Sequence, residues 1–363
     1  MNRVGKVSSA LAEHGIDALL VSQPENRRYI SGFDGSAGYA IVSDYSAILA
    51  TDFRYTAQAK MQARDFHIEE IKGEIQQWLP ELLSERHVSK LGFEAQDLPY
   101  TTWEAVQSAL AKLPTQLIPT RGIVEELRAV KDKDEIEQIE KAVALADETM
   151  AFVAKMLRPG HREREIAWEA EKFLREKRSQ SLPFEVIVAS GLNSALPHAQ
   201  SSERPLGSGV PIVVDLGARI EGYCSDLTRT LFFGEADSIF KAIYSIVAEA
   251  QQAAIAGLRE GMTGGAVDKL ARDVIEKAGY GSSFGHGLGH GIGLAVHEMP
   301  RLGPGSPHVL KEGMVFTIEP GIYLPNWGGV RIEDVVTIER KGKIRILSQA
   351  EKLSFAKEVR VHR

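Results

Sequence analysis

The feature that constrains this chain most is an aspartate inside an apolar strand. The segment Gly209-Val-Pro-Ile-Val-Val-Asp-Leu-Gly-Ala218 is typical of a buried β-strand, and Asp215 interrupts it. Burying an unpaired carboxylate is costly, so such groups are usually paired with a donor or bound to a cation. Asp215 therefore has either a structural hydrogen-bonding role or a metal-binding role.

A second aspartate follows on the neighbouring strand. After an expected turn near Glu221-Gly222, the chain continues as Tyr-Cys-Ser-Asp226-Leu-Thr-Arg-Thr. We expect a hairpin that brings Asp215 and Asp226 together, because cross-strand neighbours have Cβ atoms roughly 4.5–5.5 Å apart. Two carboxylates at that separation can share cations, so the pair favours metal binding.

A second hairpin repeats this arrangement. Glu319 ends the apolar run Met314-Val-Phe-Thr-Ile-Glu319, and Pro320-Gly321 then breaks the strand. Past a loop, the next strand carries Arg331 and Glu333 on one face, because side chains alternate along a strand. A surface Arg–Glu ladder would explain this second pair but leaves Glu319 unexplained.

Histidines complete the set of candidate ligands. Three of the ten, His286, His290 and His297, lie in Gly285-His-Gly-Leu-Gly-His-Gly-Ile-Gly-Leu-Ala-Val-His-Glu298, where glycines permit close backbone approach. Four carboxylates with one imidazole form a hard, oxygen-rich set that favours Mn²⁺ or Co²⁺, with Zn²⁺ possible. The excess of carboxylates suits two cations, because bridging carboxylates offset the repulsion between them. The only cysteine, Cys224, is expected to be a packing residue.

The chain falls into two domains with a charged segment between them. Residues 1–120 alternate short strands and helices, which predicts a small α/β domain. Residues 121–140 are densely charged and predict a linker and a helix start. Residues 141–363 combine long amphipathic helices with mostly antiparallel strands and predict an α+β domain.

The individual elements follow from apolar periodicity and turn residues. The expected helices are 4–14, 55–64, 75–85, 102–113, 134–157, 163–177, 239–259 and 266–277. The expected strands are 18–22, 39–42, 47–51, 91–93, 116–119, 184–189, 210–218, 223–233, 314–318 and 330–338.

A weak internal repeat has an offset of 101 residues. Leu157-Arg-Pro-Gly160 and Leu258-Arg-Glu-Gly261 each precede an amphipathic helix. The pattern predicts two similar halves with a site between them. The alternative is two ordinary helices that each follow a glycine.

Composition excludes several classes of partner. The chain has 363 residues and a formal charge of −6, without a basic stripe, which argues against nucleic acid. Its apolar runs are too short to span a membrane, and no signal peptide is apparent at the start. The single cysteine suits a reducing compartment. We therefore expect a cytoplasmic protein.

The ordered motifs resemble the "pita-bread" metallopeptidases, in particular Xaa-Pro dipeptidases (prolidases) and Xaa-Pro aminopeptidases. The matching segments are Asp-Leu-Gly-Ala218, Ser-Asp226-Leu-Thr-Arg-Thr, the histidine–glycine run, Thr-Ile-Glu319-Pro-Gly and Val-Arg-Ile-Glu333-Asp. Residues 29–36 and 51–59 are similar to the creatinase-like first domain of these enzymes. The resemblance implies an α+β pita-bread catalytic domain preceded by a smaller α/β creatinase-like domain.

The resemblance also implies a two-metal site, most simply two Mn²⁺ ions. Asp215 would bind one ion and His290 with Glu319 the other, while Asp226 and Glu333 would bridge both. A water or hydroxide between the cations would attack the scissile carbonyl, with Glu319 as proton acceptor and later donor.

Further roles are carried over from the family to matching positions. His198 and His297 would act in catalysis by stabilising the tetrahedral intermediate and orienting substrate, and His286 matches no ligand, so we interpret it as a local structural residue. Thr228 and Arg331 would support the ligands. The substrate-binding residues would be Phe184, Val296, His297, Arg301 and Arg331, with Phe184 and Val296 lining the proline pocket.

The substrate would be a small peptide with proline at its second position, and the enzyme a homodimer. Arg301 resembles the prolidase arginine that binds a dipeptide's terminal carboxylate, which favours a dipeptidase; as an exposed loop residue it would carry no such argument. The alternatives are an Xaa-Pro aminopeptidase acting on longer peptides, phosphotriester hydrolysis, and a catalytically inactive pita-bread binding module. Methionine aminopeptidases usually lack such a first domain.

Overall fold

The computed structural model describes residues 2–354. The chain divides into two compact units, Met1–Arg128 and Ala129–Arg363. The charged segment 121–140 is largely helical: it holds α6 (Ile123–Ala129) and the beginning of α7 (Lys133–Met156). The Asp132 side chain caps α7 by accepting a hydrogen bond from a backbone N–H of its first turn, which explains where that helix begins.

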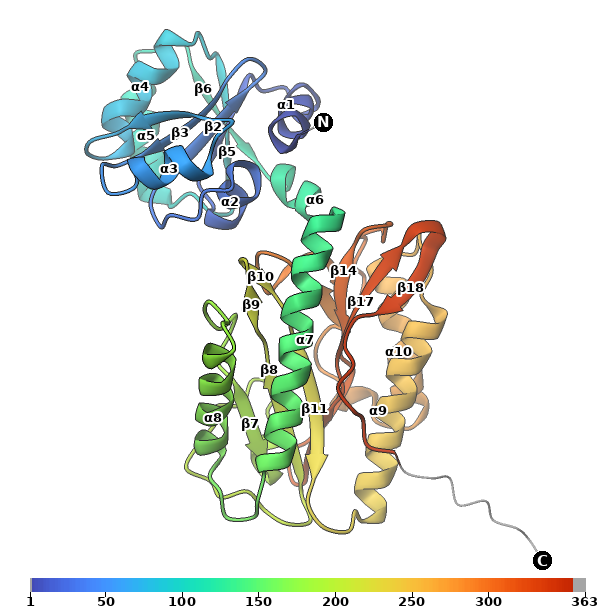
Figure 1. Ribbon diagram of the computed structural model, residues 1–363. Coiled ribbons are helices and arrows are strands. Elements are labelled where there is room, and N and C mark those ends of the chain that lie inside the picture. Colours follow the sequence, from blue (N-terminus) through green and yellow to red (C-terminus); the bar gives the residue numbers. More distant parts are fainter. Residues whose placement is uncertain (1, 355–363) are drawn as a thin grey trace, which may run out of the picture. The chain divides into compact units, whose positions relative to one another are not determined.

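A mixed six-stranded sheet, flanked by helices, forms the N-terminal unit (Figure 1). The strand order is β4-β3-β2-β1-β5-β6, and β1 runs parallel to β5 but antiparallel to β2. All four residues of β1 are buried, which accounts for its continuous apolar sequence. The strands are β1 (Ala18–Val21), β2 (Tyr39–Ser43), β3 (Ala47–Thr51), β4 (His67–Glu70), β5 (Lys90–Glu94) and β6 (Gln116–Thr120). The helices are α1 (Arg3–Glu13), α2 (Pro24–Ser31), α3 (Thr56–Gln62), α4 (Ile75–Glu85) and α5 (Tyr100–Leu110).

Two elements of this unit, α2 and β4, are not predicted by the sequence pattern. Helix α2 is polar, and it buries Asn26 and Arg27 where apolar periodicity would require hydrophobic residues. Strand β4 lies at the sheet edge, and its side chains stay partly or fully exposed. Neither segment therefore shows the apolar alternation by which the other strands and helices are predicted.

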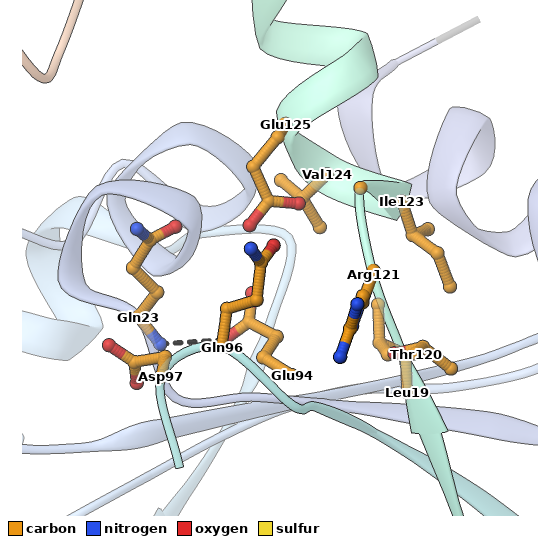
Figure 2. Close-up of a pocket in the computed structure, with 11 residues that line it drawn as sticks. Leu19, Gln23, Glu94, Gln96, Asp97, Thr120, Arg121, Ile123, Val124 and Glu125 are labelled. Atoms are coloured by element: carbon orange, nitrogen blue, oxygen red, sulfur yellow. Dashed lines mark hydrogen bonds between the residues drawn. The ribbon is translucent and has the colours of Figure 1, made fainter. Parts of the chain in front are cut away.

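A buried carboxylate connects the strand ends of this unit to α2. Glu94, at the end of β5, accepts hydrogen bonds of 2.7 Å from the backbone N–H groups of both Ser22 and Gln23, and of 2.6 Å from the Asn26 side chain. Burial raises the pKa of Glu94 to about 7 against these donors, which lower it. Glu94 and Arg121 both line a cavity of about 190 Å³, whose lining residues are drawn in Figure 2.

The second unit consists of two halves, each pairing two helices with antiparallel strands (Figure 1). In the first half, α7 and α8 pack on a three-stranded sheet of order β11-β8-β7. In the second, α9 and α10 pack on a five-stranded sheet of order β13-β12-β14-β17-β18 and on the hairpin β15-β16. The predicted α+β architecture of this unit is confirmed.

The remaining elements have the following bounds. The helices are α8 (Glu163–Glu176), α9 (Ser238–Gly257) and α10 (Gly264–Lys277), with short 3-10 turns η1 (Gly191–Ala195), η2 (Gly281–Ser283) and η3 (Arg340–Gly342). The first-half strands are β7 (Ile187–Ser190), β8 (Pro211–Leu216), β9 (Arg219–Ile220), β10 (Tyr223–Cys224) and β11 (Leu227–Phe232). The second-half strands are β12 (Gly289–Gly291), β13 (Glu298–Leu302), β14 (Val315–Ile318), β15 (Gly321–Leu324), β16 (Gly328–Arg331), β17 (Asp334–Glu339) and β18 (Lys343–Ile346).

The two halves agree with the predicted repeat. Helices α8 and α10 have 14 residues each, and both follow a glycine with positive φ, Gly160 at 91° and Gly261 at 86°. The residue before each helix also forms an isolated β-bridge, Arg162 with Pro205 and Thr263 with Val309. The similarity therefore extends beyond helices that merely follow a glycine.

Two predicted strands are wrong as continuous elements. The run 223–233 is broken between β10 and β11, and Asp226 lies in the break. The run 330–338 is broken between β16 and β17, with Glu333 in that break. Residues 222–230 and 328–338 are buried throughout, so burial does not change at either break and periodicity alone could not reveal them. Each break frees a carboxylate-bearing residue from the regular ladder.

Candidate metal centre

The first hairpin places two aspartates on neighbouring strands. Asp215 lies in β8 opposite Thr228 of β11, and Asp226 precedes β11 by one residue. Between them, the small β9–β10 hairpin turns at Glu221 and Gly222, where both φ angles are positive. The turn is where the sequence predicts it, but the direct partner of Asp215 is Thr228.

At Gly217 the backbone of this hairpin passes very close to the backbone of Ser225. A Cβ atom there would lie 2.3 Å from the Ser225 carbonyl oxygen and 2.9 Å from Cε1 of Phe184. Such distances exclude any side chain, so only glycine allows the chain beside Asp226 to approach this closely. Phe184 thereby lies next to the hairpin that carries the aspartates.

The second hairpin meets the first through Thr228. Its hydroxyl donates to Glu333 Oε2 at 2.8 Å, and the backbone N–H of Glu333 donates to the Thr228 carbonyl at 3.1 Å. Glu319 follows β14, and its backbone N–H donates to the carbonyl of Leu288, just before β12. These contacts hold Glu333 beside β11 and Glu319 beside the strand that carries His290.

His290 faces two of the carboxylates. Its Nε2 atom lies 3.4 Å from Glu319 Oε1 and 3.6 Å from Asp226 Oδ2. Its Nδ1 atom lies 3.1 Å from the Gly291 carbonyl, an arrangement that places the proton on Nδ1 and leaves the Nε2 lone pair free. Asp226, His290 and Glu333 each present one ligand atom, and these three atoms lie within 4.8 Å of one another.

The electrostatics of this group match those of an ion-binding site. Burial, followed by repulsion from neighbouring carboxylates, raises the pKa of Asp226 and of Glu333 well above their ordinary values. Burial also raises the pKa of Glu319 and lowers that of His290, which favours the neutral imidazole. Buried carboxylates this close repel one another when ionised. Either some of them keep their protons or cations bind between them.

Two carboxylate oxygens of the cluster are buried without a hydrogen-bond donor. Among the described residues, Asp215 Oδ1 and Glu333 Oε1 are buried and accept no hydrogen bond. Buried oxygens without partners are rare, because each carries a desolvation cost. The donor set of carboxylate oxygens and one imidazole therefore fits divalent cations of the Mn²⁺ or Zn²⁺ type.

Arg331 supports the site from one side. Its guanidinium donates to Asp215 Oδ2 at 2.6 Å, to the Thr228 hydroxyl at 3.0 Å and to the Tyr323 hydroxyl at 2.9 Å. Arg331 and Glu333 are 4% and 2% exposed, so the alternative of a surface ladder is wrong. Thr228 accepts from Arg331 and donates to Glu333, which fixes the direction of its hydroxyl.

Sequence reasoning missed Tyr323. Its hydroxyl lies 3.0 Å from His286 Nε2, while His286 Nδ1 lies 2.8 Å from the Gly287 carbonyl. His286 therefore belongs to a hydrogen-bonded chain that reaches Asp215 through Tyr323 and Arg331. A tyrosine in an apolar strand gives no signal of this role, because the buried hydroxyl becomes evident only from its contacts.

The predicted catalytic histidines lie near this cluster. The rings of His297 and His290 are edge to face, with centroids 4.2 Å apart. Burial, then the neighbouring His290 and His198, lower the pKa of His297. His198 itself is exposed, and the carbonyl of the preceding Pro197 accepts from Arg331 at 3.1 Å.

The remaining predicted residues flank the centre. Arg301 lies in β13, in register with His290 of β12, and is exposed; it is therefore a strand residue and not a loop residue. Val296 is partly buried in the segment before β13. Cys224 is buried, with Sγ 3.7 Å from the Leu294 carbonyl, as a packing residue would be.

Comparison with protein families gives two matches. The model of metallopeptidase family M24 matches residues 137–340, and the creatinase/prolidase N-terminal domain matches residues 3–130. The chain is a member of metallopeptidase family M24. The family and the two-domain fold expected from the motifs are thereby confirmed.

Several relatives of this M24 peptidase cover nearly its whole length. An Xaa-Pro dipeptidase of Bacillus anthracis has a solved structure with a TM-score of 0.93 and 41% identity, covering 97% of this chain and 98% of its own. The Xaa-Pro dipeptidase of Pyrococcus furiosus is 36% identical, over 95% of this chain and 97% of its own length. An X-Pro aminopeptidase structure from Thermotoga maritima has a TM-score of 0.85 and 37% identity, with coverages of 93% and 97%.

Within residues 2–354, none of the helices combines the length and the apolar character needed to cross a bilayer.

Proposed function

We propose that this M24 metallopeptidase hydrolyses the Xaa-Pro bond of dipeptides at two divalent cations held by Asp215, Asp226, His290, Glu319 and Glu333. The observation that carries the proposal is the pair of buried, unpartnered oxygens on Asp215 and Glu333 within a cluster of carboxylates whose pKa values are raised. The names of the Bacillus and Pyrococcus relatives support the choice of substrate.

The protein's own residues divide the chemical work. When bound, the cations would lower the pKa of a water and polarise the scissile carbonyl. Glu319, whose Oε1 accepts from the Thr317 hydroxyl at 3.2 Å, takes the proton of the attacking water and returns it to the proline nitrogen.

Residues around the ligands bind and orient the peptide. His198 and His297 donate to the oxygen that gains charge during attack. Phe184 and Val296 line the pocket for the proline ring. Arg331 and Thr228 keep Asp215 and Glu333 in place through the hydrogen bonds described above.

Arg301 favours a dipeptidase over an aminopeptidase. It lies in register with His290 and keeps its side chain exposed, so its guanidinium is available to a carboxylate at the end of a bound dipeptide. A longer peptide has no carboxylate at that position. The Xaa-Pro aminopeptidase remains the second candidate, because the Thermotoga structure belongs to that class.

Hydrolysis of Ala-Pro beside Ala-Pro-Ala, with Mn²⁺ and then with a chelator, tests the proposal. A dipeptidase cleaves only Ala-Pro, and the chelator abolishes cleavage. Cleavage of the tripeptide would identify an aminopeptidase. Turnover of an organophosphate without either peptide would favour phosphotriester hydrolysis, and inactivity on all three despite bound cations would favour a binding module.

Three further expectations belong to the same proposal. We infer Mn²⁺ as the working ion, from the hard donor set, and a cytoplasmic homodimer, from the single cysteine and from family resemblance. Elemental analysis of the purified protein and light scattering in solution test the ion and the dimer.

A further inference from the structure

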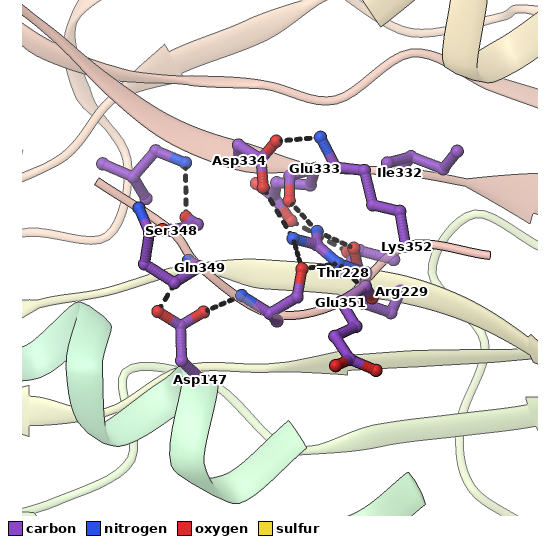
Figure 3. Close-up of polar contacts among 12 residues, drawn as sticks. Asp147, Thr228, Arg229, Ile332, Glu333, Asp334, Ser348, Gln349, Glu351 and Lys352 are labelled. Atoms are coloured by element: carbon purple, nitrogen blue, oxygen red, sulfur yellow. Dashed lines mark hydrogen bonds and ion pairs between the residues drawn. The ribbon is translucent and has the colours of Figure 1, made fainter. Parts of the chain in front are cut away.

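The segment that directly follows β18, residues 347–353, is held against the rest of the second unit by a series of hydrogen bonds. We call residues 347–353 the C-terminal strap. The Asp147 carboxylate accepts from the backbone N–H groups of Gln349 and Ala350, both at 2.8 Å, and the Ser348 hydroxyl accepts from the backbone of Val335 at 2.9 Å (Figure 3). The Leu353 N–H donates to the Tyr244 hydroxyl at 2.8 Å. The strap therefore has a fixed path although it belongs to no strand.

Arg229 joins the strap to the residue pair Glu333-Asp334. Its side chain is 1% exposed, and one amino group donates to both the Asp334 carboxylate at 2.7 Å and the Ala350 carbonyl at 2.8 Å. The other amino group donates to the Glu333 carbonyl. One buried guanidinium thus connects the strap to the backbone of a candidate metal ligand (Figure 3).

Lys352 makes a second connection, and Gln251 links it to the residues that precede both candidate glutamate ligands. Its ammonium group lies 2.5 Å from Asp334 Oδ2 and 2.7 Å from the side-chain oxygen of Gln251. The Gln251 amide nitrogen in turn donates to the carbonyls of Ile318 at 3.1 Å and Ile332 at 3.2 Å. These two isoleucines immediately precede Glu319 and Glu333.

Lys352 thereby sets the direction of a buried amide. Gln251 is 2% exposed, and its oxygen and nitrogen ends need opposite partners. A cation at the oxygen end leaves the nitrogen end facing the two carbonyls, so the backbone segments before both glutamates are held by one side chain. A neutral, apolar residue at 352 would leave the Gln251 oxygen without this donor and take one of the two cations from Asp334.

We propose that Lys352 is a positioning residue of the metal centre, which acts through Gln251 and Asp334 on the relative placement of Glu319 and Glu333. This inference rests on the proposed function, because it takes both glutamates as ligands. A purely structural strap would stabilise the fold without affecting the affinity for cations. Residues behind metal ligands typically alter that affinity when changed, because they hold the ligands in their binding geometry.

The test is titration calorimetry of metal-free full-length protein with Mn²⁺. Lys352→Met should weaken the affinity by about tenfold, the lower end of the usual effect for residues behind the ligands. Lys269→Met is the matched control: this lysine is 71% exposed in its side chain and pairs with Asp273 on the outer face of α10, so its loss should leave the affinity unchanged. Unfolding of the metal-free variants is followed in parallel.

A double-mutant cycle with Gln251→Met tests the route of the effect. If Lys352 acts through Gln251, the double variant should bind Mn²⁺ about as weakly as the weaker single variant, because coupled residues are not additive. Should Lys352→Met not fold, Lys352→Gln replaces it, with a smaller loss of affinity in the same direction. Independent, fully additive effects would contradict the route through Gln251.

Two negative outcomes have different meanings. Wild-type protein that binds no Mn²⁺, Co²⁺ or Zn²⁺ would overturn the metal centre and this inference with it. Wild-type binding together with an unchanged affinity in the Lys352 variant, whatever its stability, would overturn only the positioning role.

Discussion

Both units of this protein bury carboxylates at or beside strand ends, but they satisfy them differently. In the N-terminal unit, Glu94 accepts hydrogen bonds on both oxygens, from backbone N–H groups and from Asn26. In the catalytic unit, Asp215 and Glu333 each keep one buried oxygen without a donor. Burial raises the pKa of Glu94 and of Glu333 alike.

The comparison shows that burial and a raised pKa do not identify a metal ligand. What separates the two clusters is the supply of N–H donors. Glu94 joins strand to helix because amides surround it, whereas the second cluster gathers carboxylates around one imidazole and leaves two oxygens free. We therefore interpret Glu94 as a structural residue and the second cluster as a binding site.

The largest expected effect comes from Asp226→Asn. The change keeps the shape of the side chain but removes the charge of a proposed metal ligand, so the cations should be lost. Because a cation supplies several kcal/mol of transition-state stabilisation, activity should fall on the order of 10³-fold or more. Elemental analysis and Ala-Pro turnover measure both consequences.

The same variant also sharpens the comparison. Removing one charge from a repelling cluster should leave the metal-free protein as stable as the wild type or more stable. Normal metal content together with normal turnover would contradict the ligand assignment and place Asp226 in the same structural category as Glu94.

His198→Ala should have the next largest effect. The side chain is exposed and is not a proposed ligand, so both cations should stay bound. Loss of a donor to the developing oxyanion typically costs about 10²–10³-fold in kcat. Turnover at the wild-type rate would exclude the role, and loss of metal would show that His198 supports the ligands instead.

Arg301→Ala should have a smaller, substrate-dependent effect. Loss of a charge-assisted hydrogen bond to the dipeptide carboxylate costs on the order of tenfold in kcat/KM. Ala-Pro should suffer this loss while peptides without a carboxylate at that position should not. Equal effects on Ala-Pro and on longer Xaa-Pro peptides would remove the argument for a dipeptidase.

The sequence predicts the candidate site better than it predicts the strands that carry it. Asp215 and Glu319 are conspicuous because ionisable groups interrupt or end apolar runs, and His290 because glycines surround it. Asp226 and Glu333 were expected within continuous strands, yet both lie in breaks. A break inside a stretch that is buried throughout leaves no trace in hydrophobic periodicity.

The hydrogen bonds of Tyr323 and Lys352 to distant segments could not be predicted from local sequence patterns. Tyr323 and Lys352 resemble ordinary strand and tail residues until their partners are known, and those partners come from other elements. Helix α2 is not predicted for a related reason. Its buried Asn26 donates a hydrogen bond to Glu94, which lies 68 residues further along the chain. Polar residues that pair over such separations give no local pattern.

The smallest expected effect on activity, and the sharpest test of the contrast, comes from Glu94→Gln. Ala-Pro turnover and Mn²⁺ affinity should stay at wild-type values, because Glu94 belongs to the other unit's structural network.

The variant should instead change how the stability of the N-terminal unit depends on pH. The ordinary glutamate pKa of 4.5 rises to about 7 in the folded state, so between these pH values the folded chain holds a proton that the unfolded chain has lost. The contribution of Glu94 to stability is therefore greatest below pH 4.5 and declines as the pH rises to about 7, by up to about 3 kcal/mol. Hydrogen exchange of α2 and β5 at pH 5 and pH 8 measures this in the full chain: protection relative to the Gln variant should fall at the higher pH. The same difference in protection at both pH values would show that Glu94 is ionised throughout. A loss of Mn²⁺ affinity would show that Glu94 affects the metal centre and would contradict its purely structural role.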